Sequence, residues 1–185
     1  MDARLNQSGC CLIVLAEWKK KVYDFSKGIR AISSSIRRSI PAFLDSKIHH
    51  NNMLSLVIAK IHANIAGYDA AVMLDERGFV AELNDTNLFM LKGDTVFTPF
   101  AHACLPGITR QTFIDLLKEN KMKVQERDLS LVEFINADLV FATGTNGEIT
   151  PVTEMDGREI KCNMTFLEKI KNLFESKLPS LCEPL

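Results

Sequence analysis

The chain has 185 residues, of which 46% are hydrophobic and 24% are charged, so it is long and apolar enough for one globular domain with a sizeable core. Its 22 basic and 23 acidic residues are mixed along the sequence, and the formal net charge of -1 excludes the strongly basic surface of a typical nucleic-acid-binding protein. The five cysteines form no C-x-x-C pair, so reduced, intracellular thiols are expected.

Two strands and one helix are predicted in the first third of the chain. The apolar run 11–17 (CLIVLAE) predicts a buried strand, because it is too short to span a membrane and no basic cluster precedes it as in a signal peptide. Residues 29–36 alternate in polarity and predict a second strand, and the basic pair Arg37-Arg38 that follows is expected on a solvated face. A helix from about residue 50 to 66 is apolar nearly all round and is therefore predicted to lie in the core.

Short apolar segments separated by turns follow Gly67. They predict an antiparallel meander of strands at 70–74, 79–82, 87–91 and 96–98. A second helix is predicted from Thr109 to about Asn120, with Thr109 as its N-cap. The remaining predicted elements are strands at 123–128, 139–143 and 149–154, and helices at 131–135 and 164–177. Because no internal repeat or low-complexity linker interrupts them, one mixed α/β domain is the simplest organisation.

Four histidines are the first candidates for a functional site: His49, His50, His62 and His102. Adjacent residues at a helix start point apart, and the 13-residue step from His49 to His62 does not return to the same helical face. We therefore expect no metal site.

Lys47 and Glu82 are candidates for acid, base or nucleophilic chemistry. Lys47 lies between a loop and the predicted core helix, where desolvation can lower its pKa and make the amine nucleophilic; the alternative is an ordinary solvated lysine. Glu82 ends a predicted strand within GFVAELNDTNLF. A carboxylate at this position either faces water or holds a proton on a partner nitrogen, as a pyridine ring that acts as an electron sink requires.

Two segments rich in glycine and threonine are candidate phosphate-binding elements. In LPGITR at 105–110, a helix begins after Gly107, and its free N–H groups and positive dipole end attract anions. In ATGTNGEITP at 142–151, threonine hydroxyls follow a strand, and Gly144 permits close approach of the backbone. Taken singly, each segment is equally well explained as a helix cap or a turn.

Together and in this order, the segments resemble the class IV aminotransferases, which are fold-type IV pyridoxal-phosphate enzymes. The similarity runs from about Leu12 to the C-terminal tail and is densest at IRR, DSK with the following NN, GFVAE with NLF, LPGITR, ERD, and TGT with EITPV. The resemblance implies an α/β fold in which mixed, largely antiparallel sheets form a pseudo-barrel with packed helices. It also implies a homodimer without a nucleic-acid or membrane partner. The expected location is cytoplasmic, or organellar if a targeting segment was lost with the N-terminus.

The resemblance assigns a cofactor, pyridoxal 5'-phosphate, and the residues that bind it. It implies that Lys47 binds the cofactor covalently and later moves a proton between the substrate α-carbon and the cofactor. Glu82 would pair with the pyridine nitrogen. The phosphate would be held by Ile108, Thr109 and Thr145.

The resemblance also assigns the substrate side of the site, with two departures from the family pattern. Asn146 and Gly147 match the turn that receives the substrate carboxylate on backbone N–H groups, and Asn87 matches a support of the cofactor loop. Branched-chain enzymes usually carry a tyrosine at the fifth position after the lysine, where this chain has Asn52. The segment 83–86 (LNDT) replaces a glycine-rich sequence next to Glu82. Both departures leave the substrate class and its L or D configuration open.

The expected function is therefore that of a pyridoxal-phosphate aminotransferase acting on branched-chain or similar amino acids with a 2-oxo acid acceptor. D-amino acid aminotransferase and aminodeoxychorismate lyase are alternatives within the family, and an inactive cofactor-binding fragment is an alternative from another class. Residues 1–36 are expected to be the remnant of a small N-terminal domain and residues 37–185 the large cofactor-binding domain. With most of the small domain absent, the chain is expected to bind its cofactor weakly and to turn over poorly or not at all.

Overall fold

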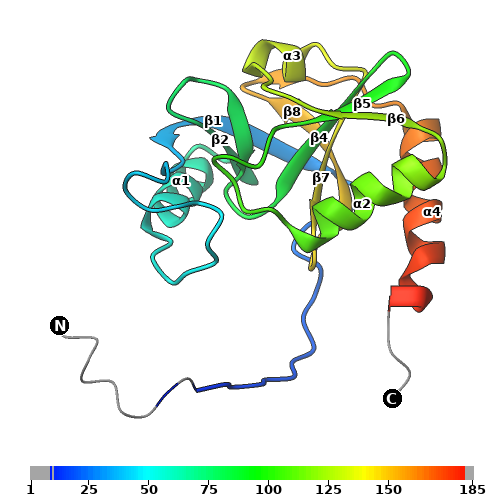
Figure 1. Cartoon of the computed structure of the whole chain (residues 1–185). Helices are drawn as coiled ribbons and strands as arrows, with labels where there is room; N and C mark the ends of the chain where they lie inside the picture. Colours follow the sequence, from blue (N-terminus) through cyan, green and yellow to red (C-terminus); the bar gives the residue numbers. More distant parts are fainter. Residues whose placement is uncertain (1–8, 10, 182–185) are drawn as a thin grey trace.

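A mixed sheet with helices packed beside it forms the centre of the computed structural model, which describes residues 9 and 11–181 (Figure 1). The strands are β1 (Ile29–Arg37), β2 (Ala70–Leu74), β3 (Val80–Leu83), β4 (Asn87–Lys92), β5 (Thr95–Thr98), β6 (Lys123–Glu126), β7 (Leu139–Gly144), β8 (Glu148–Met155) and β9 (Arg158–Glu159). The helices are α1 (Leu54–Ile65), α2 (Ile108–Glu119), α3 (Leu131–Ile135) and α4 (Met164–Leu181). None of the helices in the described residues is long and apolar enough to cross a lipid bilayer.

The strands follow the order β3-β2-β1-β8-β7-β4-β5-β6, with β9 paired to β8. Neighbours pair antiparallel except that β1 lies parallel to both β2 and β8, and β5 lies parallel to β6. This arrangement confirms the predicted mixed, largely antiparallel α/β class. β1 lies in the middle of the sheet and pairs with β2 and β8, which come later in the chain. The predicted domain boundary after residue 36 stays a prediction.

The predicted meander is correct for the pairs β2–β3 and β4–β5 but wrong between them. β3 does not pair with β4, which instead lies between β5 and β7. Residues 87–91 of β4 are buried on both faces, so this strand needs hydrogen-bonding partners along both of its edges. A short turn at 84–86 joins β3 to β4, closed by a hydrogen bond from the Leu83 N–H to the Thr86 carbonyl oxygen at 2.9 Å. This turn forms part of the site described below.

Alternate side chains of β4 enter two different hydrophobic clusters. Leu88 and Met90 belong to the cluster that includes residues of α3, whereas Phe89 belongs to the cluster that includes residues of α2 and α4. In the second cluster the Phe89 and Phe141 rings stack with centroids 5.2 Å apart, and Phe113 of α2 meets the Phe89 ring edge-on at 5.5 Å. These contacts fix α2 against β4 and β7, and therefore fix the position of the N-terminus of α2.

Helix α1 differs from the prediction in position and in burial. It begins at Leu54 rather than near residue 50, and its small side chains Ala59 and Ala63 pack on β2. The predicted core position is wrong, because the larger apolar residues face outward. Their exposed fractions are 65% for Leu54, 51% for Val57, 47% for Ile61 and 80% for Ile65.

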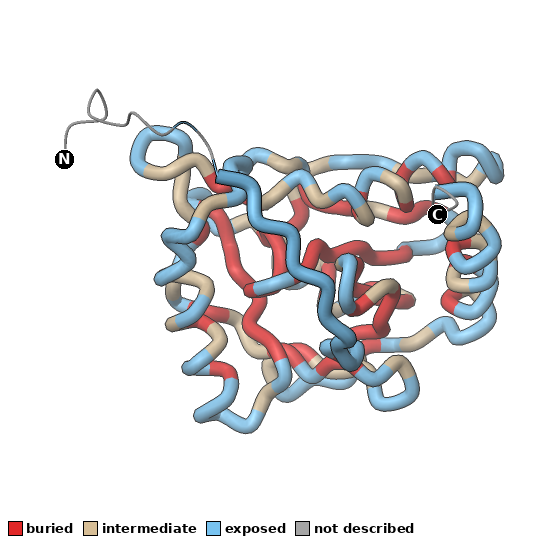
Figure 2. Tube along the Cα trace, turned by 90° about the horizontal axis from the view of Figure 1, so that it is seen from below, coloured by how far each residue is buried: buried red, intermediate tan, exposed pale blue. Residues whose placement is uncertain are grey.

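The predicted strand at 11–17 is also wrong. Residues 11–21 are irregular and exposed, and Figure 2 shows this segment as a continuous pale-blue tube after the grey N-terminal trace. Leu12 is 88% exposed and Val14 is 85% exposed. A strand requires a hydrogen-bonding neighbour, and no other segment of the described chain pairs with this one. The remaining predicted elements are confirmed, with ends that differ by a few residues.

Candidate active site

A cavity of about 510 Å³ lies where three connecting segments meet. These segments are the β3–β4 turn, the loop that leads into α2, and the β7–β8 turn, and the loop between β1 and α1 adds a fourth side. All of the predicted site residues except Gly147 line it: Lys47, Glu82, Asn87, Ile108, Thr109, Thr145 and Asn146. A cavity of this volume is within the range that accommodates small cofactors.

Glu82 contributes a buried carboxyl group to the cavity. It lies in β3, where all four residues are buried, and only 5% of Glu82 is exposed. Its Oε2 accepts a hydrogen bond from Nδ2 of Asn87 at 3.2 Å. Burial raises the pKa of Glu82 to about 7, while the Arg38 charge and the Leu105 N–H act in the opposite direction. The protonation state of this carboxyl group therefore depends on which cations lie next to it.

Arg38 is the cation next to Glu82, and the expectation that Arg38 is solvated is wrong. Its Nε lies 2.9 Å from Oε1 of Glu82 and donates to the Ala103 carbonyl oxygen at 3.2 Å. Only 8% of Arg38 is exposed. The pair Arg37-Arg38 divides at the end of β1, where Arg37 is exposed and Arg38 is buried. The sequence signal for such a partner is the acidic residue Glu82 within an otherwise apolar strand, because a buried carboxylate requires a cationic partner.

Asn87 joins two walls of the cavity. Besides its bond to Glu82, its Nδ2 donates to the Leu105 carbonyl oxygen at 3.0 Å. A Cβ placed on Gly107 would lie 2.3 Å from Oδ1 of Asn87, so the loop can approach the amide only because residue 107 is glycine. Asn87 thereby holds the segment immediately before α2 against β3 and β4.

The N-terminus of α2 opens into the cavity. Its N-cap is Gly107, and no side chain caps the helix, so the predicted capping role of Thr109 is wrong. Thr109 is instead the second helical residue. Ile108 is 86% exposed, so its backbone N–H and not its side chain is the part that can serve a ligand. Uncapped N–H groups at a helix start favour a bound phosphate or carboxylate.

The β7–β8 turn supplies hydroxyl and amide groups on the other side. Oγ1 of Thr143 is buried and has no hydrogen-bond partner among the described residues. A Cβ on Gly144 would lie 2.8 Å from Cγ2 of Thr86, so glycine allows the two turns to touch. Gly147 itself is buried behind the cavity wall, where its carbonyl oxygen accepts the Thr150 hydroxyl at 2.9 Å. An unsatisfied buried hydroxyl beside an exposed threonine and asparagine is an arrangement that an anionic ligand would complete.

Lys47 lies in the loop between β1 and α1, not at the entrance of the helix as predicted. Its side chain is 47% exposed, so the predicted desolvated environment is wrong for this structure. Asp45 contacts both ends of the residue: Oδ1 accepts the Lys47 N–H at 3.0 Å, and Oδ2 lies 3.5 Å from Nζ. The amine therefore belongs to an exposed part of the cavity lining, whereas Glu82 is buried.

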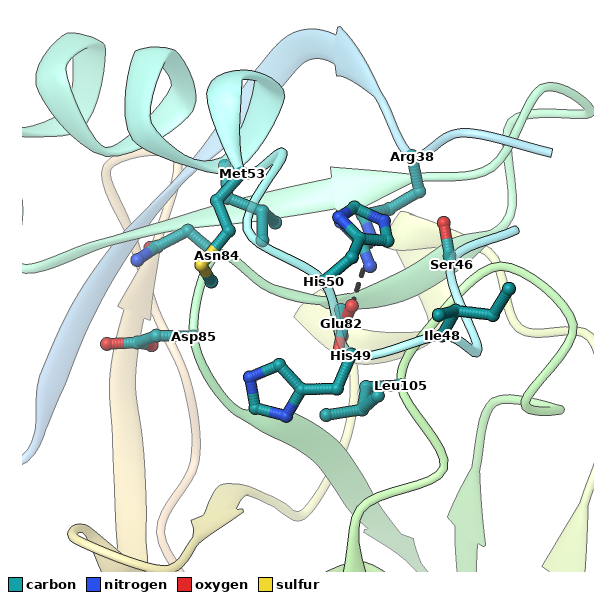
Figure 3. A pocket seen from close by; sticks show the side chains of 11 residues that line it. Arg38, Ser46, Ile48, His49, His50, Met53, Glu82, Asn84, Asp85 and Leu105 are labelled. Atoms are coloured by element: carbon teal, nitrogen blue, oxygen red, sulfur yellow. Dashed lines mark ion pairs between the residues drawn. The ribbon is translucent and has the colours of Figure 1, made fainter. Parts of the chain in front are cut away.

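A second cavity of about 170 Å³ adjoins the first (Figure 3). His49, Glu82, Asp85 and Leu105 line both cavities. The Arg38–Glu82 ion pair lies in this smaller cavity, which His50 also lines, whereas Asn52 lies outside both cavities. Sequence reasoning missed Arg38 and Asp85 as members of the site and weighed His49 only as a metal ligand.

This arrangement fits a flat, phosphate-bearing pyridine derivative with a reactive carbonyl group. Uncapped helical N–H groups and threonine hydroxyls suit the phosphate, and a buried carboxylate suits a protonated ring nitrogen. A lysine in an exposed part of the cavity lining can reach a carbonyl carbon. Each of the three chemical features of such a group thus meets a matching feature of the cavity wall.

Comparisons with known proteins identify one family. The family model "Amino-transferase class IV" matches residues 5–155. "Branched-chain-amino-acid aminotransferase-like protein 2" from Arabidopsis thaliana is 52% identical over 160 residues, covering 86% of this chain and 29% of that protein. A putative branched-chain-amino-acid aminotransferase from Methanocaldococcus jannaschii is 42% identical over 151 residues, covering 80% of this chain and 52% of that protein.

Solved structures agree with this result. The branched-chain amino acid aminotransferase from Escherichia coli has a TM-score of 0.77 at 35% identity, and the match covers 81% of this chain and 52% of that chain. The branched-chain amino acid aminotransferase from Thermobaculum terrenum, solved in its PLP-bound holo-form, has a TM-score of 0.77 at 29% identity, with 80% of this chain and 50% of that chain covered. The chain thus spans about half the length, or less, of the relatives it matches.

Proposed function

This chain belongs to the class IV aminotransferases, and we propose that it binds pyridoxal 5'-phosphate and transfers an amino group from a branched-chain or similarly apolar amino acid to a 2-oxo acid. The observation that carries the proposal is that Lys47, Glu82, Thr109 and Thr145 all face one cavity. When bound, the cofactor supplies an aromatic ring that withdraws electrons from the substrate α-carbon.

Three side chains would act on protons in this proposal. Glu82 would hold the proton of the ring nitrogen, and the charge of Arg38, 2.9 Å away, would favour the ionised form of the Glu82 carboxyl group. Lys47 would hold the cofactor at its carbonyl carbon until the substrate amine takes its place there. The freed Lys47 amine would then move the proton from the substrate α-carbon to that carbon. For this, the Lys47 amine must leave Asp45, and its half-exposed side chain permits that movement.

The remaining residues would bind anions. The N–H groups of Ile108 and Thr109, with the hydroxyls of Thr109 and Thr145, would hold the phosphate. The unpartnered hydroxyl of Thr143 supports this placement. The turn at 146–147 would receive the substrate carboxylate on its backbone N–H groups.

The names of the relatives support a branched-chain substrate over the D-amino acid and aminodeoxychorismate alternatives. The proteins from Arabidopsis thaliana, Methanocaldococcus jannaschii and Escherichia coli all carry a branched-chain name or a name likening them to it. An apolar amino acid also suits a site whose charged groups are already assigned to the cofactor and to the substrate carboxylate. Among the described side chains that line the cavity, Lys47 is the only lysine or arginine and is assigned to the cofactor, while Arg38 in the adjoining cavity is paired with Glu82.

We further propose that the chain forms a homodimer through α1. The outward stripe of α1, formed by Leu54, Val57, Ile61 and Ile65, supports this, because four large apolar side chains on one helix face favour burial against another surface. A second copy of the chain is the proposed occupant of this α1 stripe. An intracellular location is proposed on the cysteine pattern, and Cys11, Cys104 and Cys162 are free thiols.

A donor-specific half-reaction tests the proposed activity. The protein is mixed with pyridoxal 5'-phosphate and then with L-leucine, L-isoleucine, D-leucine or L-aspartate, and the loss of cofactor absorbance is followed over time. We expect conversion with the two branched-chain L-amino acids and none in a Lys47→Ala control. Equal or faster conversion of D-leucine would replace the branched-chain proposal with the D-amino acid alternative, and no conversion of any donor would contradict the proposed activity.

A further inference from the structure

Three consecutive residues ahead of β1 contact the β7–β8 turn. The Val22 N–H donates to the Asn146 carbonyl oxygen at 3.3 Å, and Nζ of Lys21 lies 2.7 Å from Oε2 of Glu148. The Tyr23 ring packs behind the turn, where a Cβ placed on Gly147 would lie 3.6 Å from Cδ2 of Tyr23. The segment therefore contacts one wall of the 510 Å³ cavity along the part assigned above to the substrate carboxylate.

Tyr23 also reaches the neighbouring β3–β4 turn. Its hydroxyl lies 2.9 Å from both Oδ1 and Oδ2 of Asp85, which belongs to the β3–β4 turn and lines the cavity. Only 8% of Tyr23 is exposed. Burial and the Asp85 charge raise the pKa of Tyr23, so its hydroxyl keeps its proton and donates to the carboxylate. One side chain thus joins two adjacent turns that both line the cavity.

We propose that Tyr23 is a positioning residue that fixes the substrate-carboxylate turn at 146–147 relative to the wall formed by Asp85. The turn needs such support, because Thr145 and Asn146 are exposed and Glu148 adopts a positive φ of 49°. Without Tyr23, the N–H groups of the turn would sample several directions, and fewer conformations would bind a carboxylate. The predicted effect on substrate binding rests on the proposed function, whereas the contacts of Tyr23 do not.

The expected kinetic effect is on binding more than on chemistry. The turn holds the substrate carboxylate equally before and during proton transfer, so its loss changes ground state and transition state alike. In an active form of the protein, Tyr23→Phe should raise KM for the amino donor about tenfold and leave kcat within about twofold, the scale of one hydrogen bond to a charged acceptor. A fall in kcat at unchanged KM would overturn the positioning role.

Hydrogen exchange measured by mass spectrometry tests the geometry on the 185-residue chain without cofactor or substrate. Tyr23→Phe keeps the ring and removes only the hydroxyl, so the core contact with Gly147 is retained. We expect faster amide exchange in peptides covering 144–148 and 83–87. Tyr68→Phe is the matched control, because the chain's other tyrosine lies under Arg30, on a segment that does not line the cavity, and its variant should leave both peptides unchanged.

A second variant keeps the test informative if Tyr23→Phe destabilises the fold. Asp85→Asn preserves the side-chain shape but removes the charge that receives the hydroxyl, and it should accelerate exchange in the same two peptides. Unchanged exchange in both variants would overturn the proposed positioning role whether or not the protein transaminates. Accelerated exchange combined with no amino-donor conversion by the unmodified chain would support the geometry and contradict the proposed function instead.

Discussion

The carboxyl group of Glu82 is held between Arg38 and the open space of the cavity, so a bound pyridinium would be its second cationic neighbour. Replacing Glu82 with Gln keeps the hydrogen-bonding shape but removes the charge that holds the ring proton. We expect the cofactor to stay bound while the half-reaction with L-leucine slows by about 100-fold or more, the usual scale for loss of a placed electrostatic group. Stopped-flow absorbance measures this rate. An unchanged rate would assign Glu82 a purely structural role.

The same residue predicts how the stability of the cofactor-free protein varies with pH. Burial raises the pKa of Glu82 from 4.5 to about 7, so between these values the folded chain binds a proton that the unfolded chain has released. The contribution of Glu82 to the free energy of unfolding therefore falls as pH rises through this window, by at most about 3 kcal/mol. Urea denaturation at a series of pH values spanning this window should show that the stability difference between Glu82→Gln and the unmodified protein changes across it. A pH-independent difference would contradict the raised pKa.

The phosphate assignment predicts a separate effect on affinity. Thr109→Val and Thr145→Val each remove one hydroxyl from the cavity, and each should weaken binding of pyridoxal 5'-phosphate by about 1–3 kcal/mol. Equilibrium titration measures the loss. Thr112→Val is the matched control, since Thr112 lies in the same helix but does not line this cavity. Equal affinities of all three variants for pyridoxal 5'-phosphate would show that neither the Thr109 nor the Thr145 hydroxyl binds the phosphate.

At the residue scale, sequence reasoning predicted which positions meet but not their environments. The order of the segments around Lys47, Glu82 and Thr109 indicated one site, and the structure brings these residues to one cavity. The burial of Arg38 could not be predicted from an adjacent pair of arginines, because burial depends on how β1 ends. The contact between Tyr23 and Asp85 joins positions 62 residues apart, and no local pattern encodes it.

At the element scale, α1 carries the clearest test of assembly. Changing Val57 to Asp and Ile61 to Lys together places charge on the α1 stripe while adding a favourable i,i+4 pair, so the helix itself is not weakened. We expect the unmodified chain to be dimeric and the double variant monomeric by light scattering. Val132→Asp on α3, where the side chain is 63% exposed, is the control and should remain dimeric. A monomeric unmodified chain would contradict the proposed interface.

The elements themselves were largely predictable from periodicity, and the failures have a common cause. The segment 11–17 and α1 both carry the apolar pattern of buried elements, yet the segment is exposed and the large apolar side chains Leu54, Val57, Ile61 and Ile65 of α1 face outward. Periodicity reports that a face favours burial, but not which surface covers it. The meander failed for the related reason that β4 pairs with β7, a strand about 50 residues later, and not with β3, the strand that precedes it in the chain.

At the scale of the whole molecule, the sheet brings the β3–β4 turn, the start of α2 and the β7–β8 turn together around one cavity. The β3–β4 turn supplies a carboxyl group, the start of α2 supplies uncapped N–H donors, and the β7–β8 turn supplies a hydroxyl group. The fold class could be predicted from the resemblance and is confirmed by strand order and by the solved relatives. The chain matches about half of those relatives' length, so the activity of the whole enzyme remains a proposal for this chain.

Lys47 is proposed to be the residue that binds the cofactor covalently, and borohydride trapping tests this assignment most directly. The protein is incubated with a slight excess of pyridoxal 5'-phosphate, reduced, digested and analysed by mass spectrometry, with Lys47→Arg and Lys60→Arg variants treated in parallel. We predict that the phosphopyridoxyl label is found on Lys47 in the unmodified chain and in Lys60→Arg, and that it is lost in Lys47→Arg. Label on another lysine, or undiminished label in Lys47→Arg, would contradict the account.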